Sequence, residues 1–392
     1  MVAGATVLRS LLTLASSAPA GVQAGLSNDT ISNVRSRLLE SANASWELGT
    51  AAEALTELYW PSLSVFRPSA FPPPTTLNSS DSASDVLAIA RNTVRTRPSQ
   101  VLPLVADDGA VGDPASIGVA VLLGAWTYGN SSGSGNASSN PFWEAAGNQL
   151  DYLLHVAPQT NDGAISHRTD QVQLWSDFVY MAPPFIAYFG ALQGGESGLG
   201  LMQYAYQQCK LYRNYLKDDS GLWRHVTLGS WQDDTHWATG NGWAAAGMLR
   251  VLETLANSDQ ADSLTEETND LTIWIQEIIN ATWPLQKENG TLYNILDDDS
   301  SFADSSSTAL LASVTYRMAY IAGDDTHLNA ANRAMALIEK SIDDDGWLQN
   351  TVNPYTFSSP NTGENHSPEG QAFVLLLQSA WRDYWLAQRK SL

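Results

Sequence analysis

Apolar residues recur at helical spacing along most of the chain, whereas the alternation typical of strands is confined to short stretches. Polar capping residues stand before several of these apolar runs, as they do at helix starts. The pattern therefore predicts an all-α protein. Helices are expected over residues 31–58, 84–96, 114–127, 141–157, 174–190, 197–217, 240–257, 263–281, 304–322, 327–342 and 368–388.

A short motif with a central glycine recurs between these helices. It reads DDGAV, NDGAI, DSGLW, ENGTL and DDGWL, and its glycines fall at positions 109, 163, 221, 290 and 346. The spacings of 54, 58, 69 and 56 residues indicate an internal repeat, and each repeat holds two predicted helices.

The predicted helices pair into about six hairpins, which favours a closed ring of helical hairpins in a single domain over residues 25–392. In such a ring the glycine loops, with short β-like segments, gather at one end, and the helices that follow them point their N-termini there. Free amides and the helix dipole favour polar or negative ligands at that position. An open helical solenoid is the alternative, in which the same loops form a ridge.

The first 24 residues are interpreted as a signal peptide, because Arg9 precedes a short apolar run and small residues follow it. Asn-x-Ser/Thr sequons begin at eight asparagines, which is typical of a secreted, glycosylated chain. The single cysteine, Cys209, excludes an intrachain disulfide and is expected to be a buried helix residue. We therefore expect an extracellular protein.

The formal charge of −21 and the sequence pI near 4.4 argue against nucleic acid or an anionic membrane as partner. The six histidines show no metal-ligand spacing, so neither a metal nor another cofactor is expected. Fourteen Trp and fourteen Tyr supply flat rings that suit sugar faces or core packing. We expect a monomer that acts on an oligosaccharide.

Asp177 is the leading candidate for chemistry. It lies beside Trp175, Phe178, Tyr180 and Met181, just where a helical pattern begins. Because desolvation disfavours the charged form of a carboxyl group, this setting predicts a raised pKa, which suits a general acid. The alternative is that Asp177 only caps the helix.

Other polar groups stand at helix starts as well. His167, Arg168 and Asp170 lie in the loop before Asp177 and are expected to reach the same helix start. Asp113 precedes Pro114 and is read equally well as an N-cap or as a ligand to a sugar.

Three further helix starts are visible. Asp304 and Ser367 are interpreted as N-caps. In HWATGNGW, the residues Gly240, Asn241 and Gly242 lie between two tryptophans, where bare backbone can approach a ligand closely.

The run QVQLWSDFVYMAPPF at 171–185, followed by HWATGNGW at 236–243, resembles glycoside hydrolase family 105, the unsaturated rhamnogalacturonyl hydrolases, with the unsaturated glucuronyl hydrolases of family 88 as cousins. The most specific motif is W-x-D-x-x-Y-M-x-x-P-F around Asp177, and SPEGQAF at 367–373 is a weaker match. The resemblance covers most of the chain beyond residue 84. It implies an (α/α)6 barrel, in agreement with the count of hairpins.

The resemblance also implies a mechanism. In this family an acid protonates the C4=C5 double bond of a terminal unsaturated uronate, water adds at C5, and the hemiketal collapses to release the sugar. Asp177 is the implied proton donor. At position 239 the family often has arginine where this chain has Thr239, which predicts a changed subsite for the uronate carboxylate. The residues expected to bind substrate are Asp113, His167, Arg168, Trp175, Tyr180, Arg224, His225, Trp237, Asn241 and Trp243.

Two other functions stay open at this point. One is a glycosidase of saturated substrates on the same barrel, which needs two carboxyl groups flanking a bond. Asp177 with Asp113, or Asp233 with Asp234, would serve. The other is a barrel that binds carbohydrate without catalysis, which the missing arginine at Thr239 favours.

Overall fold

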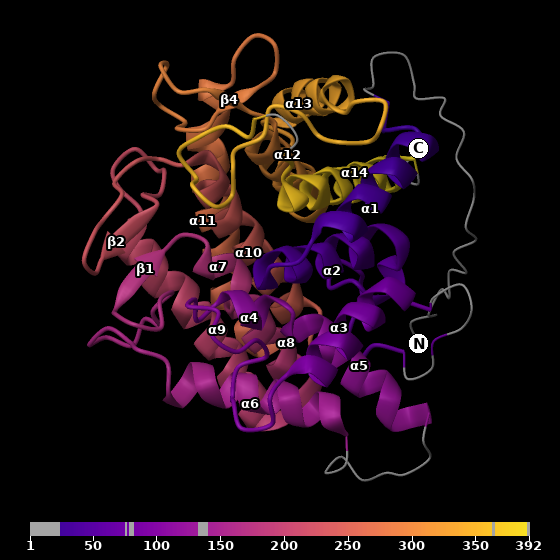
Figure 1. Ribbon diagram of the computed structural model, residues 1–392, viewed down its shortest axis with the longest axis vertical. Coiled ribbons are helices and arrows are strands. Elements are labelled where there is room, and N and C mark those ends of the chain that lie inside the picture. The colour runs from indigo at the N-terminus through magenta and orange to yellow at the C-terminus, as the bar shows by residue number, and fades with distance from the viewer. Residues whose placement is uncertain (1–23, 75–76, 78–81, 132–139, 363–364, 390–392) are drawn as a thin grey trace.

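The computed structural model describes residues 24–74, 77, 82–131, 140–362 and 365–389, and these residues form mainly helices (Figure 1). The signal peptide expected over residues 1–24 lies almost wholly outside them. Six outer helices each bury one face and leave the other in solvent. They are α1 (Asn28–Ser41), α3 (Ser84–Thr96), α6 (Pro141–His155), α9 (Gly195–Leu216), α11 (Thr265–Thr282) and α13 (Leu328–Ser341).

Six inner helices alternate with them along the chain. α10, α12 and α14 are buried on nearly every side, which is why their sequences are small and apolar around most of their circumference. Two one-turn helices, α4 (Asp113–Ser116) and α7 (Phe178–Met181), stand just before the second and third inner helices. The inner helices are α2 (Ser45–Tyr59), α5 (Gly118–Ser131), α8 (Pro183–Gln193), α10 (Ala238–Ala256), α12 (Ser305–Ile321) and α14 (Pro368–Gln388).

The inner helices form a closed ring. Each packs against the next in sequence, from α2 on α5 through α8, α10 and α12 to α14, and α14 returns to pack against α2. This last contact excludes the open solenoid. The predicted all-α (α/α)6 barrel is therefore confirmed.

The five repeated glycines share one conformation. Their φ angles lie between 86° and 96°, the left-handed region that glycine adopts without steric cost. Each lies in the loop that leads from an outer helix to the next inner helix, so all five lie at the same end of the ring, as predicted. In four turns the glycine amide donates to the carbonyl three residues earlier: Gly163 to Thr160, Gly221 to Asp218, Gly290 to Lys287 and Gly346 to Asp343.

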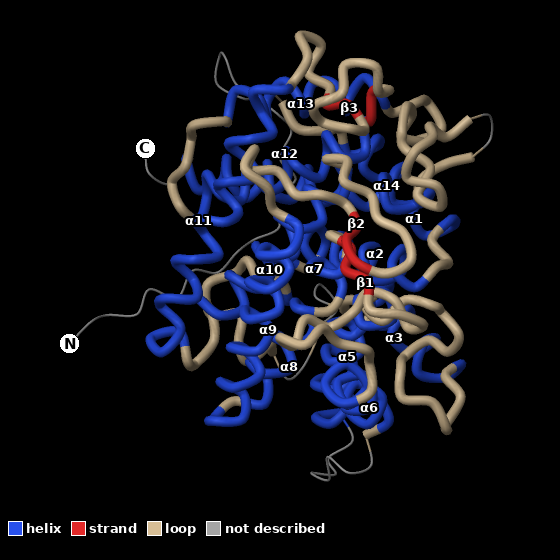
Figure 2. Tube along the Cα trace, turned by 90° about the vertical axis from the view of Figure 1, so that its left-hand side faces the viewer, coloured by secondary structure: helices blue, strands red, loops and turns tan. Residues whose placement is uncertain are grey.

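Short antiparallel ribbons stand at this loop end of the ring. β1 (Gln173–Trp175) pairs with β2 (Val226–Leu228), with Trp175 opposite Val226, and β3 (Leu292–Tyr293) pairs with β4 (Ala303–Asp304). These ribbons lie on the left of Figure 1, and that side faces the viewer in Figure 2. The ribbon of β1 and β2 joins the loops of two neighbouring hairpins.

Three predicted helices differ from the structure. The range 114–127 is divided at Ile117 into α4 and α5. Residues 31–58 are two helices, because Ala42 and Ala44 are extended and the chain turns between α1 and α2. Residues 174–190 begin as the end of strand β1 and continue as α7 and α8. The β1 segment is drawn into a strand by pairing with β2, which lies far away in the sequence and leaves no trace in the local pattern.

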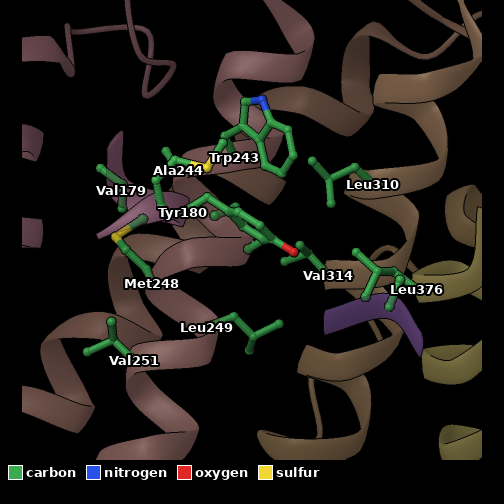
Figure 3. Close-up of a cluster of buried hydrophobic side chains, with 14 of the residues drawn as sticks. Val179, Tyr180, Trp243, Ala244, Met248, Leu249, Val251, Leu310, Val314 and Leu376 are labelled. Carbon is green, nitrogen blue, oxygen red and sulfur yellow. The ribbon is translucent and has the colours of Figure 1, made fainter. Parts of the chain in front are cut away.

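The core fills the ring from inside. In Figure 3, Trp243 from α10 lies beside Leu310 of α12, and the ring of Tyr180 from α7 points toward Val314 and Leu376 of the following inner helices. Cys209 is a free, buried residue of α9, as expected. Among the described residues, no helix is long and apolar enough to cross a membrane.

Candidate active site

His225 is the centre of an aromatic cluster at the loop end. It lies just before β2 and is 1 % exposed. The ring centroid of Trp237 is 4.5 Å from that of the imidazole, Phe357 lies at 4.6 Å and Trp175 at 5.4 Å. These rings remove water from the imidazole, so its interactions with charged groups are strong.

Two carboxylates face the two nitrogens of His225. The Nδ1 atom is 2.9 Å from the Oδ2 atom of Asp233, and the Nε2 atom is 3.5 Å from the Oδ2 atom of Asp177. The backbone supports this arrangement, because the Ser176 amide donates to the His225 carbonyl. The structure thus brings together Asp177, the implied proton donor, and His225, a residue expected to bind substrate.

The electrostatics of Asp177 differ from the prediction. Burial raises the pKa of its carboxyl group, but the neighbouring imidazole of His225 outweighs burial and holds the pKa below the usual value. Burial lowers the pKa of His225, and the nearby carboxylate of Asp177 together with the hydrogen bond to Asp233 more than reverses this effect. The expected raised pKa of Asp177 is therefore wrong: the apolar neighbours are there, but a buried cation faces the carboxylate.

Asp177 is also not a helix cap. It precedes α7, yet its carboxylate accepts no capping hydrogen bond from that helix. The hydroxyl of Ser176 donates to its Oδ2 atom at 3.3 Å. By contrast, Asp304 caps α12 through the amides of Ser306 and Ser307, and Ser367 caps α14, as predicted.

Asp113 is the carboxyl group whose pKa the site raises. Burial raises the pKa of Asp113 well above its usual value, and the charges of Asp108 and Asp177 add to the effect. Its Oδ1 atom lies 3.8 Å from the Nε2 atom of His167. Burial lowers the pKa of His167 to about 4, so at neutral pH the imidazole that faces Asp113 is neutral.

Two of the predicted cations lie toward the surface. Arg168 is near enough to Asp113 to oppose the rise in its pKa, and its Nε atom is 3.5 Å from Asp170. The side chain of Arg224 is 42 % exposed and lies 3.7 Å from Asp234. Arg168 thus belongs to the surroundings of Asp113, whereas Arg224 pairs with a solvated carboxylate.

Trp175 contacts both His167 and His225. Its ring stacks on His167 at 4.9 Å and meets His225 edge-on. The Trp231 ring lies edge-on to Trp175 at 5.3 Å and is 41 % exposed. The side-chain amide of Gln173 donates to the Trp231 carbonyl and fixes that turn.

Three predicted binding residues lie in the core instead. Tyr180 and Trp243 pack on each other with ring centroids 4.4 Å apart, and both are almost fully buried (Figure 3). The Trp243 ring also meets Phe373 edge-on, so protein already covers its expected stacking face. Asn241 is buried and uses its amide on backbone, accepting from the Trp223 amide and donating to the carbonyls of Trp223 and Trp237.

The start of α10 is built for packing against the Asp177 loop. A β-carbon on Gly240 would lie 2.4 Å from the Oγ atom of Ser176, so only glycine allows this approach. Here protein, and not a ligand, takes the space that the bare backbone leaves. Thr239 is buried, and its hydroxyl donates to Asp304 at 3.2 Å.

Three residues near this site had no distinctive signal in the sequence. Trp231 and Phe357 come from long loops, where an aromatic residue has no periodicity to place it. Glu369 opens α14, is buried, and accepts from the indole of Trp46 at 3.0 Å. Burial raises the pKa of Glu369 well above its usual value, helped by Glu47, Asp177 and Asp304. The motif SPEGQAF was the one indication of its position.

In the part of the chain that the structure describes, no three side chains of His, Cys, Asp or Glu are grouped so that they could hold a metal ion. The chemistry available is that of a carboxylate with a lowered pKa beside a buried imidazole with a raised pKa, and a second carboxyl group with a raised pKa is close by. Such a pairing can hold and deliver a proton.

Comparisons with known proteins identify the family of this chain. The family model of Glycosyl Hydrolase Family 88 matches residues 136–377, more than half of the chain. The unsaturated rhamnogalacturonyl hydrolase YesR of Bacillus subtilis (strain 168) is 23 % identical over 215 residues, which are 52 % of this chain and 58 % of that protein. The match thus spans little more than half the length of this curated relative.

Solved structures show the same fold. A possible member of the GH105 family from Salmonella enterica superposes with a TM-score of 0.69 at 18 % identity, covering 91 % of this chain and 93 % of the other. The unsaturated glucuronyl hydrolase of Bacillus sp. GL1 gives a TM-score of 0.59 at 13 % identity, covering 89 % and 94 %. With the family match, these findings confirm the resemblance: the chain belongs to Glycosyl Hydrolase Family 88 and is a glycoside hydrolase.

Proposed function

We propose that this glycoside hydrolase releases a terminal unsaturated uronic acid from lyase-generated pectic oligosaccharides, by protonation and hydration of the C4=C5 double bond. The observation that carries the proposal is the pairing of the partly exposed Asp177 carboxylate with the buried imidazole of His225. A double bond needs a proton at C4, and Asp177 with its imidazole partner can hold and deliver one. The similarity to an unsaturated rhamnogalacturonyl hydrolase supports the choice of a pectic substrate.

The other groups have roles in this reaction. Asp113, whose pKa burial raises, can donate a hydrogen bond to a hydroxyl of the sugar ring when it is protonated. His225 lies next to Asp177 and orients that carboxylate toward the uronate. The exposed ring of Trp231 offers a flat face to the next sugar. The signal peptide and the sequons support an extracellular site of action.

The first test uses oligosaccharides made by lyases from pectin and, in parallel, from glycosaminoglycans. The ultraviolet absorbance of the double bond should disappear on incubation with the native protein, faster for pectic products. The Asp177→Asn variant should leave the absorbance unchanged. If neither class of oligosaccharide loses its absorbance, the proposal is wrong.

One observation favours a second candidate, a glycosidase of saturated substrates. The pKa of Asp113 is raised by burial while that of Asp177 is lowered by His225, and such a difference between two carboxyl groups is also how an acid and a nucleophile are assigned in ordinary glycosidases. Brisk cleavage of a saturated aryl glycoside by the native protein, abolished in Asp177→Asn, would place this candidate first.

A further inference from the structure

Asp233 is fixed more firmly than an ordinary loop carboxylate. Its backbone amide and carbonyl exchange hydrogen bonds with Val226 at 2.9 and 3.0 Å. Its Oδ1 atom accepts from the amide of Thr235 at 3.1 Å, and its Oδ2 atom faces the Nδ1 atom of His225 at 2.9 Å. Both oxygens and the backbone are therefore held in place.

The imidazole of His225 is consequently clamped between two hydrogen-bond acceptors. A carboxylate accepts hydrogen bonds and cannot donate them, so Nδ1 must carry a proton to bond Asp233. The Nε2 atom points toward Asp177 and has no hydrogen-bond partner within the described residues. Only a second proton on Nε2 makes that side of the ring complementary to a carboxylate as well.

The surroundings of His225 leave few other groups that can set its charge. The titratable groups that act on it are Asp177, Asp233 and His167. Its remaining neighbours are the rings of Trp175, Trp237 and Phe357. Since the imidazole is 1 % exposed, a proton on Nε2 is shielded from exchange with bulk water.

We propose that Asp233 is a positioning residue that holds His225 as an imidazolium, and that His225 is the store from which Asp177 is supplied with its proton. The proposal rests on the proposed hydration reaction. The proposal goes beyond that reaction because it assigns the origin of the proton. Asp177 is ionised in the free protein and does not itself carry that proton.

The step balances as follows. The Nε2–H bond breaks and the proton passes to the Asp177 carboxylate, which delivers it to C4 of the uronate as the C4=C5 π bond breaks. Water adds its oxygen to C5 and gives its proton to the Asp177 carboxylate, from which it returns to Nε2. One water is consumed, and both side chains end as they began.

The pH dependence of kcat/KM tests the role of Asp233, because kcat/KM reports ionisations of the free enzyme. Asparagine in its place still accepts from Nδ1 through its Oδ1 atom but removes the negative charge. The alkaline limb of the profile, where His225 loses its proton, should therefore move down by about one pH unit or more. The matched control is Asp234→Asn: that carboxylate is the next residue, 72 % exposed and paired with Arg224, and its loss should leave the limb in place.

A purely structural Asp233 predicts a different result. Asp233→Asn would then lower the rate at all pH values, and its profile would have the same alkaline limb as the native profile. That outcome would overturn the proposal.

A second measurement does not depend on the variant's folding or on turnover. The His225 ring is titrated by NMR in the native protein, with its signal assigned from a His225→Gln sample. The imidazole should lose its proton at the pH of the native alkaline limb. A ring that is neutral over the whole pH range of activity would refute the proposal that His225 stores the proton. Without turnover of any unsaturated substrate the proposed function fails, whereas this titration still decides whether His225 is held as a cation.

Discussion

The Nε2 atom of His225 and the Oδ2 atom of Asp177 lie 3.5 Å apart, although they come from different hairpins of the barrel. The pairing of Trp175 with Val226 across β1 and β2 brings the two loops into register, and each candidate residue lies within two residues of this pair. The short ribbon is therefore what assembles the acid and its partner. The chemistry of Asp177 is set by a contact between hairpins and not by the apolar residues beside it in sequence.

Asp177→Asn should lower turnover of unsaturated oligosaccharides by about 10²–10⁴-fold, because the amide keeps the shape but cannot deliver a proton. Cooperative melting should persist, since the carboxylate caps no helix. Asp113→Asn should have the same effect less severely. The control is Asp170→Asn, which changes an exposed carboxylate of the same loop. Near-native turnover of Asp177→Asn would falsify its assignment.

Two tryptophans should respond in opposite ways to truncation. Trp231→Ala should raise KM by up to about tenfold, since a ring contact worth about 1 kcal/mol is lost, and leave the melting temperature unchanged. Trp243→Ala should destabilise the protein by about 3–5 kcal/mol through a core cavity. Kinetics and denaturant unfolding of both variants check this. A raised KM in a stably folded Trp243→Ala would restore its predicted role in substrate binding.

Asn241→Ala should act on stability and not on binding. Its side chain satisfies buried backbone groups of Trp223 and Trp237, and each group left unpaired costs about 1–3 kcal/mol. Urea unfolding should show the loss, while the KM of the folded fraction stays native. A large rise in KM without loss of stability would return Asn241 to the substrate site.

Glu253, on the inner helix α10, is expected to make the free energy of unfolding depend on pH. Burial raises the pKa of its carboxyl group to about 7, against the opposing charge of Arg317. The folded state then binds this proton more tightly than the unfolded state. Its contribution to the free energy of unfolding is complete below the usual pKa of 4.5 and is lost as the pH rises through about 7.

Glu253→Gln should therefore raise the free energy of unfolding by up to about 3 kcal/mol at pH 8 and leave it nearly unchanged at pH 4. Denaturant unfolding at both pH values measures the difference. The exposed Glu266→Gln on α11 is the control and should have no effect at either pH. An equal effect of Glu253→Gln at pH 4 and pH 8 would contradict the assigned pKa.

Adding a methyl group to a glycine of the repeated turns should lower the stability of the protein. Gly163 has a φ of 92° and nothing within 4 Å of an added β-carbon, so Gly163→Ala isolates the backbone strain, about 1–2 kcal/mol. Gly147 in α6 is equally open but helical, and Gly147→Ala should stabilise by about 0.5–1 kcal/mol. Opposite shifts in melting temperature are expected. A shift of the same sign in both would show that the turn conformation is not the cause.

The sequence predicted helices best where local pattern decides them. The ranges 84–96 and 368–388 agree with α3 and α14 to the residue. Strand β1 was missed, because its partner β2 is distant in the chain. Glycine spacing predicted the shared loop end, since a left-handed turn needs that residue wherever it recurs.

The sequence predicted only part of the site, because several of its contacts form only when the helices pack. The motif around Asp177 identifies the loop, but it carries both a site residue and core residues such as Tyr180. Which side chains face the loop end depends on how α7 and α10 are rotated against each other, and sequence spacing does not give that. The raised pKa of Asp113 follows from burial and from Asp108, and the lowered pKa of Asp177 follows from His225, all of which act only in the folded chain.

Closure of the ring has a consequence for biosynthesis. Among the described residues, the main contacts between inner helices join helices that are next to each other in the chain, except for the contact of α14 with α2, which closes the ring. During translation the first five inner helices can assemble as an open arc, but the apolar flanks of α2 and α12 stay uncovered until residues 368–388 leave the ribosome. These two flanks are the surfaces that a nascent chain exposes longest, and they are where a chaperone would bind it.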